Sequence, residues 1–203
     1  HGILSYEKQR KIIKKFGPSF RLAGFDSLNY CLLAEGKVDA VIEANLKPYD
    51  ILPLIPIIKN AGAIVSITGR DKKKLESVAA DINVIPIHLD VTKYNSIAVK
   101  TLDAFHSMGG IDVLINNAGI GEFGPLESVK VDQFERVFAT NVYGLTMMTQ
   151  EVAKFMKAQE RGTIINIGST ASTNGFASGS VYCASKFAVR GLTACWRNEL
   201  RKN

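Results

Sequence analysis

Short apolar segments alternate with amphipathic segments from residue 63 onward, and this alternation is what most constrains the fold. Strands are predicted at residues 63–68, 84–89, 111–116 and 163–167, and helices at residues 71–82, 95–107, 131–158 and 181–201. Nearly continuous apolar strands that alternate with helices are typical of a parallel sheet with helices on both faces. We therefore predict an α/β fold, a doubly wound parallel sheet in three α/β/α layers. It is incomplete at the C-terminus, because no closing strand follows the last helix.

Composition narrows the class of protein further. The chain has 203 residues, 46% hydrophobic and 22% charged, and this balance is typical of a soluble globular protein. The net charge of +6 suits an anionic ligand, but the basic residues form no long arm, so we expect no nucleic-acid partner. The longest apolar run, residues 51–58, is too short to span a bilayer, so we expect no membrane partner.

The cysteines and histidines argue against disulfides and metal. Three widely spaced cysteines, Cys31, Cys183 and Cys195, fit a reducing compartment better than a disulfide scaffold, so we predict a cytoplasmic protein. The three histidines have no metal-ligand spacing, and no metal site is predicted.

A tyrosine and a lysine on the last predicted helix suggest catalytic chemistry. Tyr182 and Lys186 stand at positions i and i+4 and therefore share a helix face. An ammonium beside a phenol favours the phenolate, which would let Tyr182 act as a general acid or base. Ser169 follows the strand at 163–167, at the sheet edge where ligands bind in open α/β folds. The spacing alone is weak evidence, since solvated Tyr and Lys pairs also occur by chance.

Further motifs carry a resemblance to a known family. The sequence NNAG at 116–119 ends a predicted strand, Asn141 lies inside the long helix, and Ser169 precedes Tyr182 by 13 residues. From about residue 65 to 203 the chain resembles the classical short-chain dehydrogenase/reductase family, whose Rossmann-like fold agrees with the predicted layers. The family's catalytic tetrad falls on Asn141, Ser169, Tyr182 and Lys186.

The resemblance implies a role for each of these residues. Tyr182 would exchange a proton with the substrate oxygen, and Lys186 would favour its phenolate and hold the nicotinamide ribose. Ser169 would polarise the carbonyl, and Asn141 would support a water relay. The implied reaction moves a hydride between the nicotinamide of NADP, or of NAD, and a small-molecule carbonyl/alcohol pair.

The resemblance also implies residues that bind the cofactor, with Tyr182 and Lys186 among them. Asp90 and Val91 resemble the pair that contacts adenine. Arg70, at the end of a strand, stands where the family often meets a ribose 2′-phosphate and would favour NADP, although a plain surface charge is an equal alternative. The backbone of the cofactor would be lined by Asn117, Ala118 and Gly119.

One feature of that family is missing from the sequence. No TGxxxGIG loop precedes the strand at 63–68, and the equivalent turn at 44–50 has no glycine but contains Pro48 and Asp50. The sequence GIGEFG at 119–124 satisfies G-x-G-x-x-G, but it overlaps NNAG and has no acidic residue about 20 positions later. We interpret it as a flexible loop on the substrate side.

The first part of the chain resembles a different family. Residues 21–62 contain Gly24-x-Asp26-x-x-x-Tyr30, then AEGKVD, then Tyr49-Asp50 before a helix, and they are similar to the C-terminal half of inositol monophosphatase-like proteins. Asp50 would match a metal-ligand aspartate there, but the upstream DPxDGT-type motif is absent. We predict a phosphatase-like segment at 1–62, whose strand at 38–44 would complete the sheet as a βαβ unit. A truncated reductase domain would follow at 63–203.

Three functional hypotheses follow from this hybrid sequence. The first is an oxidoreductase, which resemblance predicts to be a homo-oligomer formed through the helices at about 131–158 and 181–201. The second is a catalytically inactive hybrid or fragment with a structural role. The third is a Mg²⁺-dependent phosphatase, which lacks most of the expected ligands.

Overall fold

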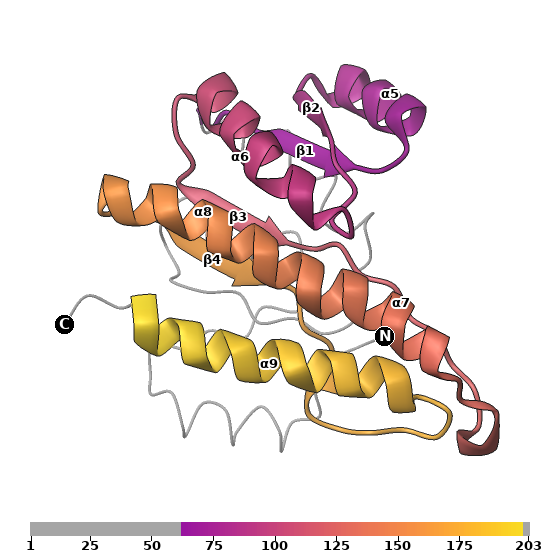
Figure 1. Cartoon of the computed structure of the whole chain (residues 1–203). Helices are drawn as coiled ribbons and strands as arrows, with labels where there is room; N and C mark the ends of the chain where they lie inside the picture. Colours follow the sequence, from indigo (N-terminus) through magenta and orange to yellow (C-terminus); the bar gives the residue numbers. More distant parts are fainter. Residues whose placement is uncertain (1–61, 201–203) are drawn as a thin grey trace, which may run out of the picture. The chain divides into compact units, whose positions relative to one another are not determined.

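The structure is a computed structural model that describes residues 62–200 (Figure 1). The predictions made for the first 61 residues, among them the strand at 38–44 and the role of Asp50, lie outside the described residues. The strands are β1 (Ser66–Gly69), β2 (Ile85–His88), β3 (Val113–Asn116) and β4 (Thr163–Asn166). The α-helices are α5 (Lys72–Ile82), α6 (Tyr94–Met108), α7 (Val131–Phe138), α8 (Leu145–Gln159) and α9 (Ser180–Leu200). Short helical segments are η2 (Leu126–Ser128), η3 (Ala139–Gly144) and η4 (Thr170–Ser172).

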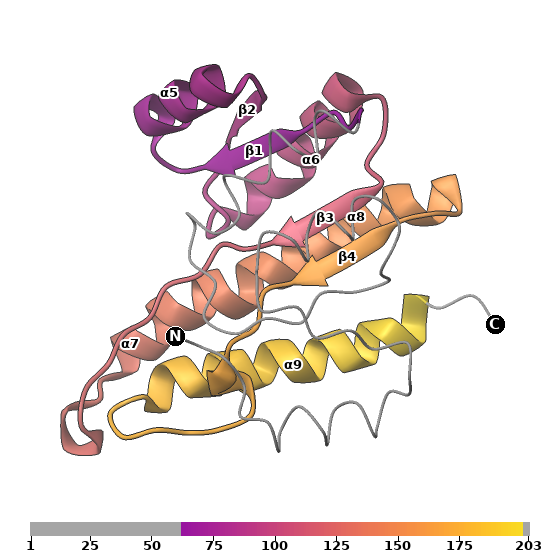
Figure 2. The same ribbon diagram turned by 180° about the vertical axis from the view of Figure 1, so that it is seen from behind.

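The strands form two parallel pairs. β1 pairs with β2, and β3 pairs with β4 in the register Asn116↔Asn166. In both Figure 1 and Figure 2, β1 and β3 are the neighbouring members of the two pairs. Within residues 62–200, no strand of one pair is hydrogen-bonded to a strand of the other. These residues therefore form part of a Rossmann-like fold rather than one continuous sheet. The predicted α/β class with parallel strands is therefore confirmed. Residues 62–200 do not, however, form the single continuous sheet that was predicted.

The helices begin and end near the predicted positions for local reasons. Asp71 precedes α5, and its carboxylate accepts a hydrogen bond of 3.0 Å from the Lys74 N–H, which satisfies a free donor of the first turn. Helix α6 ends at Gly109, where a φ of 73° requires the left-handed conformation that glycine adopts without strain. None of the helices within residues 62–200 is long and apolar enough to cross a membrane.

The long helix predicted at 131–158 is interrupted. Its middle turn, η3, is π-helical, so the segment divides into α7, η3 and α8. A π-turn adds a residue to the turn and is frequent at functional sites. Asn141 lies within this turn. The apolar periodicity of the flanking sequence does not predict the π-turn.

Helix α8 covers one face of β3, and α6 packs on β2 and on α8 (Figures 1 and 2). The core at this contact contains Ile111, Val152 and Met156. The Asn116 amide donates to Thr149 Oγ1 at 2.9 Å and to Asn166 Oδ1 at 2.8 Å, so the C-terminal ends of β3 and β4 are tied to each other and to α8. These ends carry the loops that contain four of the predicted site residues, namely Asn117, Ala118, Gly119 and Ser169.

Candidate active site

Tyr182 and Lys186 lie one turn apart near the start of α9. The Lys186 ammonium is 5.9 Å from the centroid of the Tyr182 ring, and it donates a hydrogen bond of 2.9 Å to the Ile167 carbonyl. Only 7% of Lys186 is exposed, and this burial lowers the pKa of its ammonium below the ordinary value. A buried cation thus stands beside a phenol, at the end of β4.

Asn141 connects the π-helical turn to this pair through one further residue. The buried Asn141 amide donates to the Ile120 carbonyl at 2.9 Å and to Ser185 Oγ at 3.0 Å. Its oxygen accepts from the Ile120 N–H at 2.8 Å, and the Ser185 hydroxyl donates to the Tyr182 carbonyl at 2.7 Å. The side chain of Asn141 therefore holds the loop after β3 and the first turns of α9 together.

Ser185 is a site residue that our sequence reasoning missed. It is fully buried, and its hydroxyl receives the Asn141 amide while it donates to the backbone of α9. Its position three residues after Tyr182 places it on the same helix face, and that spacing is the signal that could have found it.

The NNAG loop approaches both polar groups of the site. A Cβ at Gly119 would lie 3.4 Å from Asn141 Oδ1 and 3.8 Å from Lys186 Nζ. Asn117 and Ala118 are exposed at the same loop. The loop backbone at Gly119 therefore lies beside the buried lysine.

Ser169 lies at the turn that follows β4. Its Oγ accepts a hydrogen bond of 3.1 Å from the Ala171 N–H, and its own N–H donates to Ser172 Oγ at 3.1 Å. The short helix η4 that it caps packs on α9. Because Oγ serves as acceptor there, the hydroxyl hydrogen is available to a substrate oxygen.

A phenylalanine contacts the candidate catalytic tyrosine, and a second phenylalanine lies against the first. Phe123 meets the Tyr182 ring edge-on, with centroids 5.5 Å apart, and Phe176 lies 6.1 Å from Phe123. Both phenylalanines are more than half exposed, at 58% and 51%. The phenol therefore has an apolar, solvent-facing neighbourhood, in which a ring or an alkyl group would be desolvated on binding.

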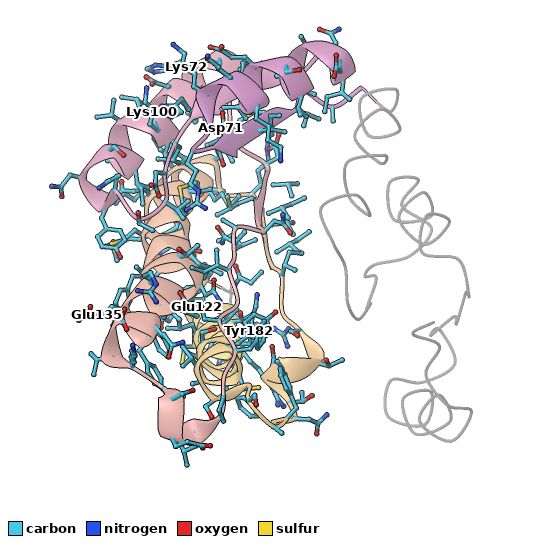
Figure 3. All side chains as sticks on the ribbon, turned by 90° about the vertical axis from the view of Figure 1, so that its right-hand side faces the viewer. Asp71, Lys72, Lys100, Glu122, Glu135 and Tyr182 are labelled. Atoms are coloured by element: carbon cyan, nitrogen blue, oxygen red, sulfur yellow. The ribbon has the colours of Figure 1, made fainter. Side chains whose placement is uncertain are left out.

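An ion-pair network fixes the loop that carries Phe123. The Arg136 guanidinium on α7 donates to both Glu122 oxygens, at 2.7 and 2.8 Å, and to Asp132 at 2.7 Å. The hydrogen bond from Arg136 lowers the pKa of the Glu122 carboxyl. Figure 3 shows Glu122 in the same part of the view as Tyr182. The predicted flexible loop is thus anchored at Glu122, next to the glycines of GIGEFG.

The predicted cofactor residues at the other strand pair have defined environments. Asp90 follows β2, and its Oδ1 accepts from the Thr92 N–H at 2.9 Å and from the Thr92 hydroxyl at 2.8 Å. The backbone hydrogen bond from Thr92, helped by the Thr92 hydroxyl and the charge of Arg70, lowers the pKa of Asp90. Val91 packs on the π-helical turn, where a Cβ at Gly144 would lie only 2.8 Å from its carbonyl oxygen.

We expect Asp90→Asn to lower the free energy of unfolding by about 1 kcal/mol at pH 7, because it removes the charge that strengthens two hydrogen bonds. The lowered pKa means that this contribution is complete above the ordinary value of 3.8 and is lost as the pH falls through the pKa of the folded state. Urea unfolding at pH 7 and at about pH 2 measures both effects. Asp81→Asn, at an exposed position of α5, is the matched control, and an equal loss from both variants would contradict the prediction.

Arg70 is exposed at the end of β1, just before the helix α5. Lys72 begins that helix, and Figure 3 shows Asp71 and Lys72 at α5, well apart in the view from Tyr182 and Glu122. The predicted site residues therefore form two groups, one around α9 and one after β1 and β2. Among residues 62–200, no group of His, Cys, Asp and Glu side chains could hold a metal ion.

Comparison with protein families gives two matches. Residues 57–203 match the short chain dehydrogenase model, and residues 3–103 match the inositol monophosphatase family model. Both resemblances drawn from the sequence are confirmed, and the second extends beyond the predicted 21–62. Because the two matches overlap, the boundary between residues 62 and 63 stays a prediction.

Curated relatives and solved structures agree with the first match. A sorbitol dehydrogenase of Cereibacter sphaeroides is 38% identical over 65% of this chain and 53% of its own length. An inactive 2-(S)-hydroxypropyl-CoM dehydrogenase of Xanthobacter autotrophicus is 36% identical over 66% of this chain and 59% of its own. A metagenomic short-chain oxidoreductase solved with NADP has a TM-score of 0.69 and 33% identity, over 74% of this chain and 71% of its own. The chain spans about half the length of the curated relatives that it matches.

Proposed function

Because the chain belongs to the short chain dehydrogenase family, we propose that it interconverts a carbonyl compound and an alcohol with NADP(H). The observation that supports this most is the buried Lys186 beside Tyr182, joined to Asn141 through Ser185. Such an arrangement suits a proton transfer at the Tyr182 hydroxyl.

Each residue of the site has its own role in the proposed proton transfer. The phenol of Tyr182 gives a proton to the substrate oxygen during reduction and takes it back during oxidation. The Lys186 ammonium stabilises the phenolate that remains, since an adjacent positive charge favours the ionised form. The Ser169 hydroxyl donates to the same substrate oxygen and so polarises the carbonyl. Asn141 acts as a positioning residue that fixes the loop after β3 against α9.

The described residues fit a nicotinamide dinucleotide at two places. At one, the backbone at Gly119 leaves room beside Asn141 and Lys186 that a side chain would fill. At the other, Arg70 presents an exposed guanidinium, which suits a ribose phosphate. When bound there, the dinucleotide supplies the hydride acceptor or donor. Lys186 would hold its nicotinamide ribose, residues 117–119 would line its backbone, and Asp90 and Val91 would contact its adenine.

The charge of Arg70 supports NADP over NAD. We expect Arg70→Gln to weaken NADPH binding by about ten-fold and to leave NADH binding within about two-fold, because only NADPH carries the 2′-phosphate that a guanidinium can bind with two hydrogen bonds. Parallel titrations of the chain and the variant with both nucleotides measure the ratio. An equal loss for the two nucleotides would make Arg70 a general surface charge.

The aromatic surroundings of Tyr182 favour an apolar substituent on the substrate. Phe123 exposes ring surface next to the phenol, and the exposed ring of Phe176 lies against Phe123. A carbonyl with an adjacent ring or alkyl group would bury this surface, whereas a charged substrate would have to be desolvated there.

The direct test is a titration of the whole 203-residue chain with NADPH, followed by the nucleotide's fluorescence, with Tyr182→Phe in parallel. Saturable micromolar binding by both proteins is expected, because the phenol takes part in proton transfer and leaves the dinucleotide contacts intact. Turnover of a panel of aryl and alkyl ketones is then measured as the loss of the same NADPH fluorescence. Absence of binding by the folded chain would overturn the proposal.

One observation favours the alternative of an inactive hybrid. The sequence at 44–50, the counterpart of the family's phosphate-binding loop, contains no glycine but has Pro48 and Asp50. In that case the site residues are inherited but unused, and the same titration gives no signal. A Mg²⁺-dependent phosphatase has less support, because Asp50 matches one ligand of that family but the upstream DPxDGT-type motif that supplies the others is absent from the sequence.

We also propose a homo-oligomer formed through α7, α8 and α9. Apolar side chains stand exposed on this part of the chain, namely Val131, Phe134, Tyr143 and Phe187. Burying them against a second copy would remove apolar area from water. We expect light scattering to give at least twice the chain mass of 22.1 kDa, and a strictly monomeric species would contradict this.

The free thiols of Cys183 and Cys195 agree with the cytosolic location predicted from the sequence.

A further inference from the structure

Two backbone contacts hold the ends of the loop that follows β3. At one end, the Ile120 N–H donates to Asn141 Oδ1 at 2.8 Å. At the other end, the Gly124 N–H donates to the Ser178 carbonyl at 2.9 Å, which joins the loop to the segment before α9. In the part of the chain that the structure describes, the backbone of residues 121–123 forms no hydrogen bond, so side chains decide where these residues lie.

The side chain of Glu122 attaches the middle of this loop to α7. Its two carboxylate oxygens accept from Arg136 Nε at 2.7 Å and from Arg136 Nη2 at 2.8 Å, the bidentate geometry in which a guanidinium and a carboxylate pair most strongly. Arg136 also donates to Asp132 at 2.7 Å, one turn earlier on the same helix, and the Gln133 side chain is a further hydrogen-bond partner of Glu122. The strongest attachment of the loop to α7 is therefore the one to Arg136.

Phe123 is the next residue of the loop, and its ring contacts the phenol of Tyr182. The two rings meet edge-on, with centroids 5.5 Å apart. A Cβ at Gly121 would lie 2.8 Å from Phe123 Cζ, so the ring folds back over the backbone of its own loop. Because Glu122 precedes Phe123 directly, a movement of the Glu122 attachment would displace this ring from Tyr182. The aromatic surface beside the phenol thus depends on a contact with α7.

From these contacts we propose that Arg136 is a positioning residue. Through Glu122 it holds Phe123 against Tyr182, and it thereby sets the affinity of the site for a carbonyl compound with an aromatic substituent. The inference rests on the proposed function and adds to it a residue that touches neither the substrate nor the cofactor. Proton transfer at the Tyr182 hydroxyl does not involve Arg136, so its loss weakens substrate binding and leaves the chemical step intact.

Steady-state kinetics distinguish this role from a catalytic one. Arg136→Met keeps a long side chain and removes its hydrogen-bond donors. We expect it to raise KM for acetophenone about five-fold and to leave kcat and KM for NADPH within about two-fold. KM for butanone, which has no ring to contact Phe123, should change by less than about two-fold. A lower kcat with an unchanged KM for acetophenone would overturn the proposal.

A double variant tests whether Arg136 acts through Glu122. Glu122→Ala should raise KM for acetophenone as much as Arg136→Met does. The two changes together should give no further rise, because all three variants break the same attachment of the loop. Effects that multiply in the double variant would show that the two residues act independently, which would contradict the proposed role.

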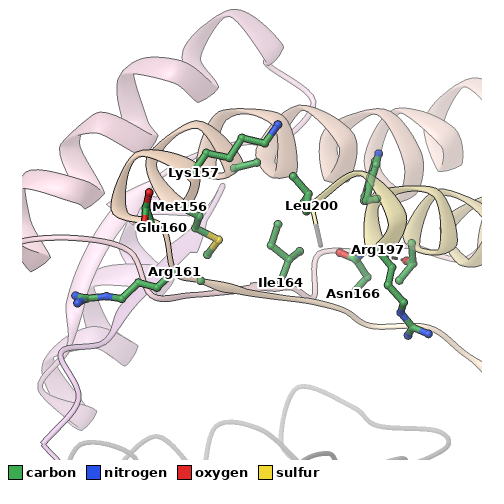
Figure 4. A pocket seen from close by; sticks show the side chains of 12 residues that line it. Met156, Lys157, Glu160, Arg161, Ile164, Asn166, Arg197 and Leu200 are labelled. Atoms are coloured by element: carbon green, nitrogen blue, oxygen red, sulfur yellow. Dashed lines mark hydrogen bonds between the residues drawn. The ribbon is translucent and has the colours of Figure 1, made fainter. Parts of the chain in front are cut away.

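Two variants are matched controls. Asp132→Asn neutralises the partner of Arg136 on its own helix and leaves both hydrogen bonds to Glu122. Arg161→Met breaks another exposed pair of arginine and carboxylate, to Asp112 at 2.8 Å. Figure 4 shows Arg161 beside a hollow between α8, β4 and α9, which no residue of the loop after β3 lines. In both controls KM for acetophenone should stay within about two-fold of that of the unaltered chain.

Two further measurements on the whole chain need no turnover. Hydrogen exchange followed by mass spectrometry should be faster at residues 120–124 in Arg136→Met than in the unaltered chain, and equal at residues 111–117. Binding of acetophenone, titrated by NMR with and without NADP, should weaken about five-fold, and this oxidised nucleotide cannot give a hydride to a ketone. Both results support the positioning role even where NADPH gives no turnover, and then the proposed function alone fails. Unchanged exchange, unchanged affinity or no acetophenone binding at all would overturn the inference.

Discussion

Tyr182→Phe is expected to reduce turnover of a carbonyl substrate by about 1,000-fold, within the range that general acid–base catalysis contributes. The substitution removes one hydroxyl and keeps the ring, so the edge-on contact with Phe123 and the helix remain. The backbone carbonyl of residue 182 still accepts from Ser185. Steady-state rates with NADPH and the best ketone of the panel measure the loss.

The NADPH affinity of Tyr182→Phe distinguishes the loss of the proton donor from misfolding. We expect it to change by less than about two-fold in Tyr182→Phe, because the hydroxyl is proposed to act on the substrate. Phe176→Leu is a useful companion variant, since it alters the aromatic neighbourhood without touching an acid or base. Its effect should fall on KM rather than on kcat. Full turnover by Tyr182→Phe would remove the tyrosine from the reaction.

Lys186→Met should have opposite effects on turnover and on stability. Turnover should fall at least about 100-fold, because the cation that stabilises the phenolate is lost. The free energy of unfolding should rise by about 1 kcal/mol at pH 7, since a buried ammonium without a carboxylate is replaced by an apolar chain of similar length. Urea unfolding and steady-state kinetics on the same preparation measure the two.

The pH dependence of that stability difference follows from the lowered pKa of Lys186. In the unfolded chain the ammonium has its ordinary value of 10.5, so between the folded pKa and 10.5 the unfolded chain holds more protons. The unaltered chain is therefore stabilised relative to the variant as the pH rises through the folded pKa. We expect the advantage of Lys186→Met to be constant at lower pH and to shrink in this window. A destabilised variant at pH 7 would mean that the hydrogen bond to Ile167 outweighs the burial of charge.

Much of the fold could be predicted from the sequence because its signals are local. Strand and helix positions follow from apolar periodicity, and the end of α6 from a single glycine, Gly109. The closeness of Tyr182 and Lys186 follows from helix geometry alone, since residues four apart share a face.

The parts that could not be predicted depend on contacts distant in sequence. The π-turn around Asn141 is associated with hydrogen bonds to Ile120, which lies 21 residues earlier, and no periodicity encodes that. The bridging role of Ser185 needs a partner 44 residues away. The division of the strands into two pairs is likewise a matter of pairing, which apolar runs alone do not specify.

This division has a mechanical consequence for the enzyme that we propose. The two strand pairs are connected on one face by the packing of α6 on β2 and on α8, and α8 in turn packs on β3. Within residues 62–200, no strand-to-strand hydrogen bonds join the pairs, so the helix packing connects them within one compact unit. Arg70 and Asp90 follow the strands of one pair, and Lys186 donates to the Ile167 carbonyl just after the other. A dinucleotide that contacted both strand pairs would connect them. Part of its binding free energy would then be used to hold the two pairs in one arrangement.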